Sequence, residues 1–517
     1  MKTRHPEKSS SYLSNSRPSC PTVASSPIST NRPPITAYAT LPAYGRPHGS
    51  RHRRSPLPRP APDAGRDIGT GTGIRAGFDI LSGWGRTAPS LAYVLRPRTP
   101  EEAVAAVLSY GHGARGAIAR GLGRAHGDAA QNAGGTVLDL TGLTRIRAVD
   151  AVAGLVVCDA GVGLHRLTQA LLPLGWCVPV APATRHVTVG GAVATDVHGA
   201  NHPAAGSFSR HVVSLDLLTA DGQVHTAVPG MPLFDATTGG LGLTGAILSV
   251  TLRLLPVETA LMRVDTERAT GFDDLLARFT APCHRHRHTV ARVDLLARGA
   301  ATGRAVLVRA DHAPYDALPP RVRRTPLALR PGGLPGGLPG SAGVAALLDG
   351  LRSRAGRPGT GRPLPLAAFL HPRDGLLRGH GRRGGFVRYE VAVGDGQEEA
   401  LRRVVGRIAA RGRAAGPGVL KRFGEAGPGL LSFPPAGPGW GFAVDLPASS
   451  GGLGRFLDEL DEEIAAAGGR VRLAEDARLR PGLVAAMYPG LGEFRELRAA
   501  LDPGAVFVSD LARRLGL

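Results

Sequence analysis

The sequence predicts an α+β protein, and three features of its residue pattern lead to that class. Short apolar runs typical of strands are separated by glycine-rich turns. Asp221-Gly222 lies between two such runs, which is the usual signal of an antiparallel hairpin. The helical segments are short and do not alternate regularly with strands, as they do in doubly wound α/β proteins. With 517 residues, the chain is long enough for two or three domains.

Composition divides the chain into four expected parts. Residues 1–75 are rich in Ser, Pro and Arg and lack apolar periodicity, so we expect a disordered basic tail. Residues 76–258 hold most of the strand-like runs and form a first domain. Residues 259–450 form a second domain, in which 311–385 contain the run PGGLPGGLPG and are predicted to be low-complexity loops. Residues 451–517 have a mostly helical pattern.

Local signals place the elements in order. A strand is expected at Leu91–Leu95, and a helix over 101–110 follows an N-cap at Thr99 with Pro100 in the first turn. The pattern HRLTQALLPLG predicts an amphipathic helix that ends at a glycine. Further strands are expected at GAIARG, TVLDL, LVVCDAGV, VVSLDLLTA, GAILSVTLRLLPV, FVRYEVAV and GWGFAVDLP, and a helix is expected from Leu453 to Ala467.

The charge distribution argues against a nucleic-acid-binding surface. The net charge is +21, but residues 1–70 carry 11 Lys/Arg against 3 Asp/Glu, and residues 301–384 carry 14 Arg against 4 Asp. Both stretches are rich in Pro and Gly, so the globular part is close to neutral and no nucleic-acid partner is expected. The chain has no apolar run of about 18 residues and no secretory pattern, and Cys158 and Cys177 resemble buried thiols. We therefore expect a cytoplasmic protein with at most peripheral membrane contact.

Three glycine-rich segments are the candidates for ligand binding. In the first, ARGLGRAHGD at 119–128, the glycines allow close backbone approach and the amides can surround a pyrophosphate. It matches neither a P-loop nor a GxGxxG fingerprint. The second, at 182–199, concentrates small residues before His198, which suits a flat cofactor lying on the backbone. The third, TGGLGLTG at 238–245, precedes a strand.

These segments resemble the vanillyl-alcohol-oxidase-type (PCMH-type) FAD-binding domain, and within it the decaprenylphosphoryl-β-D-ribose 2′-oxidase family. The similarity runs from Phe78 to the C-terminus with a gap over the low-complexity middle. The stretches that carry it are SGWGRTAPS, RGAIARGLGR, GDAAQN, TVGGA, DVHGANH, AGSF, LLTADG, GGLGLTG, LSFP and SDLARRL.

The resemblance implies a two-lobed fold, with an FAD lobe, a substrate (cap) lobe built on an antiparallel sheet, and a C-terminal segment that packs back on the FAD lobe. The residues expected to cradle the pyrophosphate are Ala119, Arg120, Gly121, Leu122, Gly123, Arg124, Ala125, His126, Gly127, Asp128 and Ala129. Those expected to line the flavin are Ala183, Thr188, Val189, Gly190, Gly191, Thr195, Asp196, Val197 and His198, with Ile247 on the adenine side.

The chemistry that the resemblance implies is hydride transfer from a sugar or polyol carbinol carbon to flavin N5, which gives a carbonyl. Lys421 and His198 are the expected catalytic residues, because either can remove the hydroxyl proton. Lys421 can equally serve as a fixed positive charge. Reoxidation by oxygen or quinone is expected, and the family also uses a partner reductase.

Departures from the family pattern concentrate in the substrate pocket. Gly441 and Ala443 stand where the family has asparagine and cysteine, and Ala200 and Glu475 stand where it has lysines. Arg472 takes the place of a tyrosine that contacts the cofactor. These changes argue against tight binding of a phosphorylated prenyl sugar. An aldonolactone or alditol oxidase and a flavin-binding protein with decayed catalysis are the alternatives.

His126 replaces a tyrosine of the family pattern. Related sugar and polyol oxidases bond a histidine at the equivalent position to the flavin 8α-methyl, so we hypothesise that His126 is a covalent attachment site. The alternative is a noncovalent histidine that contacts the ring or faces solvent. The run CHRHRH at 283–288 also contains metal-binding residue types, but its arginines repel a cation and no second ligand cluster is visible. We expect an exposed loop or strand edge there and no metal.

Overall fold

A computed structural model describes residues 73–281, 286–318, 320, 323, 327, 359–372, 384–414 and 416–517. These residues belong to one compact unit that begins at Ala39. The expected tail at 1–75 lies almost wholly outside the described residues, and so does the run PGGLPGGLPG. None of the helices in the described part of the chain has the length and apolarity needed to cross a bilayer.

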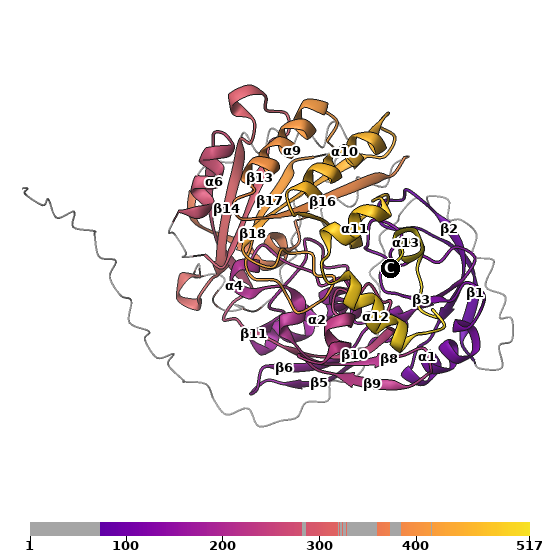
Figure 1. Ribbon diagram of the computed structural model, residues 1–517. Coiled ribbons are helices and arrows are strands. Elements are labelled where there is room, and N and C mark those ends of the chain that lie inside the picture. Colours follow the sequence, from indigo (N-terminus) through magenta and orange to yellow (C-terminus); the bar gives the residue numbers. More distant parts are fainter. Residues whose placement is uncertain are drawn as a thin grey trace, which may run out of the picture. The chain divides into compact units, whose positions relative to one another are not determined.

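The first lobe contains two main sheets that share an apolar core (Figure 1), and a short pairing of β7 (Trp176–Cys177) with β11 (Leu255–Pro256). A four-stranded sheet combines an antiparallel pair with two parallel pairings, in the order β1 (Arg75–Leu81), β2 (Ser90–Arg96), β4 (Thr136–Asp139), β3 (Ala117–Arg120). A five-stranded antiparallel sheet has the order β5 (Ile146–Asp150), β6 (Leu155–Asp159), β10 (Ala246–Arg253), β8 (Val212–Leu218), β9 (Val224–Ala227). The hairpin predicted around Asp221-Gly222 is confirmed as β8 and β9.

Short helices connect these strands, and their ends follow the sequence signals. Helix α1 (Pro100–Ala106) is capped by the Thr99 side chain, which accepts a hydrogen bond from the Glu102 amide, and a π-helical turn extends it to Gly111. Helix α2 (Leu164–Leu171) ends in a 3₁₀ turn at Gly175, whose φ of 79° favours glycine. The remaining helices of this lobe are α3 (Val189–Ala194), α4 (His202–Ala205) and α5 (Pro232–Thr237).

The second lobe is built on one eight-stranded antiparallel sheet. In spatial order its strands are β15 (Gly359–Pro365), β12 (Leu261–Ala269), β14 (Ala305–His312), β13 (His288–Val293), β17 (Gly418–Phe423), β18 (Gly439–Pro447), β16 (Phe386–Gly394) and β19 (Arg470–Val471). Helices α6 (Phe272–Thr280), α9 (Glu398–Arg411) and α10 (Leu453–Ala466) cover one face of the sheet (Figure 1). The mixture of helices and antiparallel sheets agrees with the predicted α+β class.

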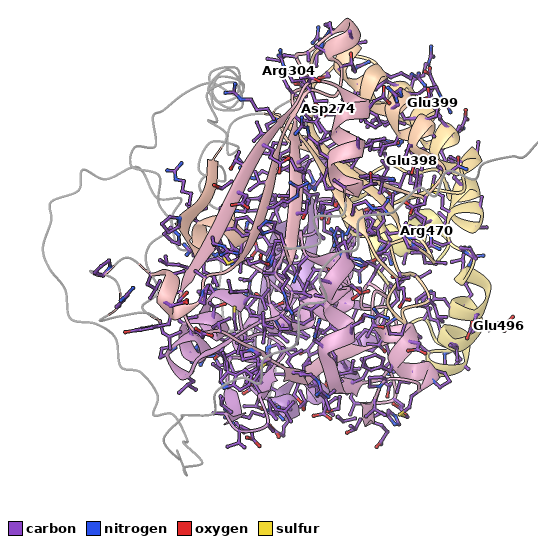
Figure 2. All side chains as sticks on the ribbon, turned by 90° about the vertical axis from the view of Figure 1, so that its left-hand side faces the viewer. Asp274, Arg304, Glu398, Glu399, Arg470 and Glu496 are labelled. Carbon is purple, nitrogen blue, oxygen red and sulfur yellow. The ribbon has the colours of Figure 1, made fainter. Side chains whose placement is uncertain are left out.

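Side chains of β16 alternate between that helix-covered face and the opposite face, as a pleated strand requires. Tyr389 and Val391 of β16 belong to the apolar core beneath the helices. Arg388 and Glu390, on the same strand, point to the opposite face and line a cavity. Figure 2 shows Glu399 and Glu496 on the outer sides of α9 and of α12 (Leu491–Leu501), where charged side chains remain hydrated.

Two expected boundaries need correction. The stretch 311–385 is not entirely loop, because β15 pairs with β12 and is followed by α8 (Leu366–Leu370). Leu366 is buried in a small apolar cluster, which anchors this edge of the sheet. The segment 451–517 also does not pack on the first lobe as a whole. The buried side chains of α10, among them Leu457 and Leu460, belong to the core beneath the large sheet.

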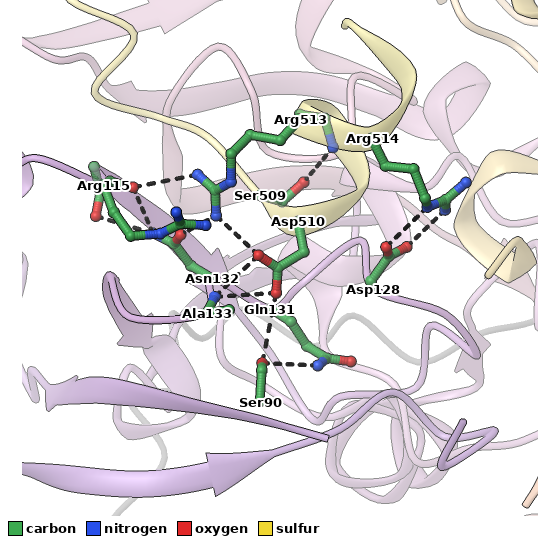
Figure 3. Close-up of polar contacts among 12 residues, drawn as sticks. Ser90, Arg115, Asp128, Gln131, Asn132, Ala133, Ser509, Asp510, Arg513 and Arg514 are labelled. Atoms are coloured by element: carbon green, nitrogen blue, oxygen red, sulfur yellow. Dashed lines mark hydrogen bonds and ion pairs between the residues drawn. The ribbon is translucent and has the colours of Figure 1, made fainter. Parts of the chain in front are cut away.

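The end of the chain does return to the first lobe, where polar contacts hold it (Figure 3). Helices α11 (Pro481–Met487), α12 and α13 (Asp510–Leu515) form this segment. Both carboxylate oxygens of Asp510 accept from the Ala133 amide at 3.0 Å. Arg514 donates two hydrogen bonds to Asp128, at 2.8 and 3.1 Å. Because Asp128 is the last residue of the first glycine-rich segment, the C-terminal helix braces that segment.

We predict that Asp510→Ala weakens this anchoring. The change leaves the partly buried Ala133 amide without its acceptor, so the free energy of unfolding should fall by about 1–3 kcal/mol. Urea denaturation of the purified protein measures the loss. Glu496→Ala, on the exposed side of α12, is the control and should change stability by less than about 0.5 kcal/mol. Equal losses in the two variants would show that the Asp510 contacts contribute nothing specific.

Candidate active site

A cavity lies where the two lobes meet and is lined by residues of both. Together with its open mouth it encloses about 1290 Å³. One end is walled by the glycine-rich segments of the first lobe. The other end is walled by Arg388, Glu390, Lys421, Arg472 and Glu475 of the second lobe. The cavity therefore runs from the bare backbone of the first lobe to the charged side chains of the second.

At the first-lobe end, glycines replace side chains that would fill the cavity. A Cβ atom on Gly121 would lie 2.2 Å from Thr188 Oγ1, so the two segments can approach only through glycine. Gly123 has a φ of 62°, and a Cβ there would meet the Arg120 guanidinium at 2.2 Å. Arg120 in turn holds the loop, because it donates to the carbonyl oxygens of Ala130 and Ser82, each at 2.8 Å.

The second glycine-rich segment forms the adjoining wall. Thr188 accepts a hydrogen bond from the Gly191 amide and caps α3. A Cβ on Gly190 would lie 2.8 Å from the Cβ of Ala160, so bare backbone faces the neighbouring strand end. On the opposite side, the Arg124 guanidinium lies 3.8 Å from the centre of the Trp84 ring. These bare walls fit a flat, elongated group that lies against the backbone.

The structure brings most of the sequence-predicted site residues to this cavity. Those that line it are Ala119, Arg120, Gly121, Leu122, Gly123, Arg124, Ala125, His126, Ala129, Ala183, Thr188, Gly190, Gly191, Thr195, Val197, His198, Ile247 and Lys421.

Four predicted residues instead lie behind the cavity wall, and this corrects the sequence-based expectation. Gly127 packs so closely on the Asp476 carbonyl that a Cβ would come within 1.6 Å of its oxygen. Asp128 binds Arg514, and Val189 is fully buried in the first-lobe core. Asp196 accepts from Ser207 Oγ at 2.6 Å and from the Ser209 amide at 3.0 Å. Each therefore positions the wall rather than forming its surface.

The inner end of the cavity holds Lys421, His198 and Glu390 in mutual contact. Lys421 Nζ lies 3.1 Å from His198 Nδ1 and 3.5 Å from Glu390 Oε1. His198 Nε2 lies 3.6 Å from the same carboxylate oxygen. The His198 ring is fixed by Phe423 and by Phe433, whose centroids lie 4.9 and 5.6 Å away. Both predicted catalytic residues therefore meet at one point of the cavity.

Glu390 is the residue that the sequence analysis missed. Its side chain is 2% exposed, and it binds Arg388 and Arg472, each with an N–O distance of 3.3 Å. Arg388 also binds Asp445 at 2.9 Å, and Arg472 also binds Glu475 at 3.3 Å. The sequence signal was FVRYEVAV, an apolar strand with two charges spaced two residues apart and so on one face.

Where strand β18 passes between Lys421 and Glu390, its two residues on the cavity face are small. Lys421 pairs with Gly441 and Glu390 pairs with Ala443, because β18 separates β17 from β16. A Cβ atom on Gly441 would already lie 2.4 Å from the Phe423 ring. Gly441 and Ala443, two of the departures from the family pattern, are therefore the small residues across which Lys421 and Glu390 make their contact.

His126 also faces the cavity, where it contacts Glu475, a residue that stands in place of a lysine of the family pattern. Its imidazole Nδ1 forms an ion-pair contact with the Glu475 carboxylate. Its ring meets Phe386 edge-on at a centroid distance of 5.4 Å. His126 is 6% exposed, so the alternative of a solvent-facing loop histidine is wrong.

Burial and charge shift the pKa values of the inner group in different directions. Burial lowers the pKa of Lys421, Glu390 raises it, and Arg472 and Arg388 lower it further, to about 8. Burial, with Lys421 next in size, holds the pKa of His198 well below its usual value, so this imidazole is neutral. Burial alone raises the pKa of Glu390, but Lys421, Arg388 and Arg472 bring it well below its usual value.

The CHRHRH run shows no metal-binding geometry where it is described. Cys283, His284 and Arg285 lie outside the described residues. His286 lies between Asp311 and Asp265, at 2.8 and 3.0 Å, and His288 is 3% exposed in the middle of the large sheet. The expected exposed edge is therefore wrong for these two histidines. No group of three His, Cys, Asp or Glu side chains suited to a metal occurs in the part of the chain that the structure describes.

Residues 91–227 match the family model of the FAD binding domain (FAD_binding_4). An uncharacterized protein of the mprA 5′ region from Streptomyces coelicolor is 56% identical over 375 residues, which cover 69% of this chain and 100% of that protein. Decaprenylphosphoryl-beta-D-ribose oxidase from Mycolicibacterium smegmatis is 40% identical over 451 residues, 84% of this chain and 97% of that protein. Alditol oxidase from a Streptomyces species is 31% identical over 164 residues, 32% of this chain and 39% of that protein.

We predict that Lys421 titrates near pH 8 and that Glu390→Gln lowers its pKa further, since the substitution removes the carboxylate that stabilises the ammonium. The chain has three lysines, at positions 2, 8 and 421. With Lys2→Arg and Lys8→Arg in the background, the resonance of ¹³Cε-labelled lysine reports Lys421 alone. A midpoint near the ordinary value of 10.5 would contradict the proposed environment.

The lowered pKa of Lys421 also makes the free energy of unfolding depend on pH. Because the pKa of Lys421 in the folded state, about 8, lies below its ordinary value of 10.5, the folded state binds fewer protons than the unfolded state between these pH values. The contribution of Lys421 to the free energy of unfolding therefore rises across this window and is lowest below pH 8. In Lys421→Met this part of the pH dependence should disappear.

Proposed function

Because this chain belongs to the family of FAD-dependent oxidoreductases that includes decaprenylphosphoryl-beta-D-ribose oxidase, we propose that it oxidises a CH–OH group of a sugar or polyol to a carbonyl. The observation that carries the proposal is the contact of Lys421 and His198 at the inner end of a glycine-walled cavity. When bound, FAD supplies the acceptor for the hydride that leaves the carbinol carbon.

Residues at one end of the cavity would bind the cofactor, and residues at the other end would bind the substrate. The backbone at Gly121, Gly123 and Thr188–Gly191 would hold the pyrophosphate and the flavin ring, because only bare backbone permits so close an approach. Ile247 would lie at the adenine side, where it is buried. The second-lobe end, with the antiparallel sheet behind it, would hold the substrate and exclude water from the reacting carbon.

Lys421 is the base that we propose for the substrate hydroxyl. A hydride leaves an alcohol more easily once the O–H proton is removed, and a group that titrates near neutral pH serves best. With a pKa of about 8, part of the Lys421 population is neutral at physiological pH. Its Nζ then accepts the hydroxyl proton, while His198, held neutral by burial, orients Nζ through the 3.1 Å contact.

The reaction needs a small-molecule substrate and an external electron acceptor. For the acceptor we propose oxygen or a quinone, which regenerates the oxidised cofactor after each turnover. A partner reductase that acts on the carbonyl product belongs to the same proposal, and any membrane contact would be peripheral. The mycobacterial relative is named for a ribose substrate that carries a decaprenylphosphoryl group.

A second candidate function is that of an aldonolactone or alditol oxidase with covalent FAD, and His126 is the observation that favours it. A carboxylate at Nδ1 favours the tautomer with its proton on that nitrogen, so that Nε2 carries the nucleophilic lone pair. That nitrogen would bond to the flavin 8α carbon in place of one of its C–H bonds, whose proton would be released to solvent while two electrons pass to the external acceptor. The intact Lys421–His198–Glu390 cluster argues against the alternative of decayed catalysis.

We predict that Lys421→Met keeps the bound flavin but slows its anaerobic reduction by a polyol or aldose about 10²–10⁴-fold, since the variant lacks the base. Stopped-flow bleaching of the flavin absorbance measures the rate. Lys8→Met is the control and should reduce at the parent rate. Equal rates in Lys421→Met and the parent would remove Lys421 from the mechanism, and failure of every alcohol to bleach the parent flavin would favour decayed catalysis.

For His126 we expect the flavin colour to stay with the polypeptide after acid precipitation, because the imidazole bond survives denaturation. His126→Tyr should release all of the flavin into the supernatant while still binding it before denaturation. His225→Tyr, on the exposed strand β9, is the matched control and should behave as the parent does. A colourless pellet from the parent protein would leave His126 as a noncovalent contact.

A further inference from the structure

The inner end of the cavity is charge-balanced. Its cations are Arg388, Lys421 and Arg472, and each binds a carboxylate within the wall. Glu390 binds all three. Two further carboxylates complete the balance, because Asp445 binds Arg388 and Glu475 binds Arg472. With His198 neutral, three cations therefore face three anions.

Because each of these cations is already paired with a carboxylate, the charges at the inner end limit which ligands can bind there. A phosphate group offers only acceptor oxygens and negative charge, so it binds where cations have no anionic partner. Here a phosphate would have to approach Glu390, which is 2% exposed and ionised, or displace it from its arginines. Both are unfavourable in a site shielded from water.

A hydroxyl group meets no such obstacle. It donates one hydrogen bond and accepts two, so it can bridge a carboxylate and a guanidinium without disturbing their pairing. The inner wall presents both kinds of group side by side, with the Glu390 carboxylate between Arg388 and Arg472. Neighbouring hydroxyls on one carbon chain could engage successive pairs.

We propose that the inner end of the cavity selects an uncharged polyhydroxylated substrate, such as a free sugar, a polyol or a sugar lactone, and that Glu390 excludes substrates that carry phosphate there. The proposal rests on the proposed function, because it names the substrate class of the same site. Glu390 is in this respect a specificity-determining residue, beside its contact with Lys421.

The test compares matched neutral and phosphorylated ligands on the flavin-loaded protein. The pairs are ribose and ribose 5-phosphate, ribitol and ribitol 5-phosphate, and glucitol and glucitol 6-phosphate. Kd is read from the perturbation of the flavin absorbance spectrum under anaerobic conditions, and flavin bleaching is recorded separately. We expect a phosphorylated ligand to bind at least about tenfold more weakly than its neutral partner.

Variants then test whether Glu390 and Glu475 cause the selectivity against phosphorylated ligands. Glu390→Gln removes the charge with little change of shape, so the ratio of the two Kd values should shift about tenfold or more toward the phosphorylated ligand. Glu475→Gln should shift it in the same direction, and it provides a second reading if Glu390→Gln does not fold. Glu459→Gln, whose parent carboxylate binds Arg407 on the surface of α10, is the control and should leave the ratio unchanged.

The outcomes separate the two proposals. Phosphorylated ligands that bind as tightly as their neutral partners would overturn the selectivity, and so would ratios unchanged in both Glu390→Gln and Glu475→Gln. Absence of binding by every neutral ligand would overturn it as well. Neutral ligands that bind selectively without ever bleaching the flavin would instead overturn the proposed oxidation and leave the selectivity standing.

Discussion

One buried carboxylate, that of Glu390, holds together the charged side chains at the inner end of the cavity. Glu390 is buried on β16 of the antiparallel sheet, and its ionised form persists only because Arg388, Lys421 and Arg472 surround it. Removing a single member of such a group leaves an uncompensated charge in the interior, which is strongly unfavourable. The positions of all four side chains are therefore mutually dependent. Through Arg472 and Glu475 the same network reaches His126, so that it joins the second lobe to the glycine-walled lobe.

Small residues shape both ends of the cavity, but for different physical reasons. At Gly121 and Gly190 the missing Cβ atoms let backbone segments approach each other and leave bare walls for a flat cofactor. At Gly441 and Ala443 small side chains clear a path across β18, so that long side chains from β17 and β16 meet above it. In the first case the backbone itself is the binding surface, and in the second it is only the floor beneath a polar cluster.

The sequence predicted the features that depend on contiguous residues. The Thr99 cap, the β8–β9 hairpin and the glycine-rich walls are each encoded within about 20 residues, and the structure places them as expected. Glu390 was missed because its role depends on strand order, in which β18 lies between two strands that precede it in the chain. Strand β15 was missed because its arginine, glycine and proline residues resemble the low-complexity stretch before it, while pairing with β12 decides its structure.

The cluster also reconciles two requirements that Lys421 must meet. To accept a proton it must be neutral, which burial and the two arginines favour, whereas Glu390 favours the ammonium form. The attraction between Lys421 and Glu390 is strongest once the proton has arrived on Nζ. The carboxylate therefore stabilises the state that follows deprotonation of the hydroxyl more than the state that precedes it, and only such differential stabilisation accelerates a reaction. Without burial and the two arginines, Lys421 would remain protonated and the same carboxylate would prevent catalysis rather than assist it.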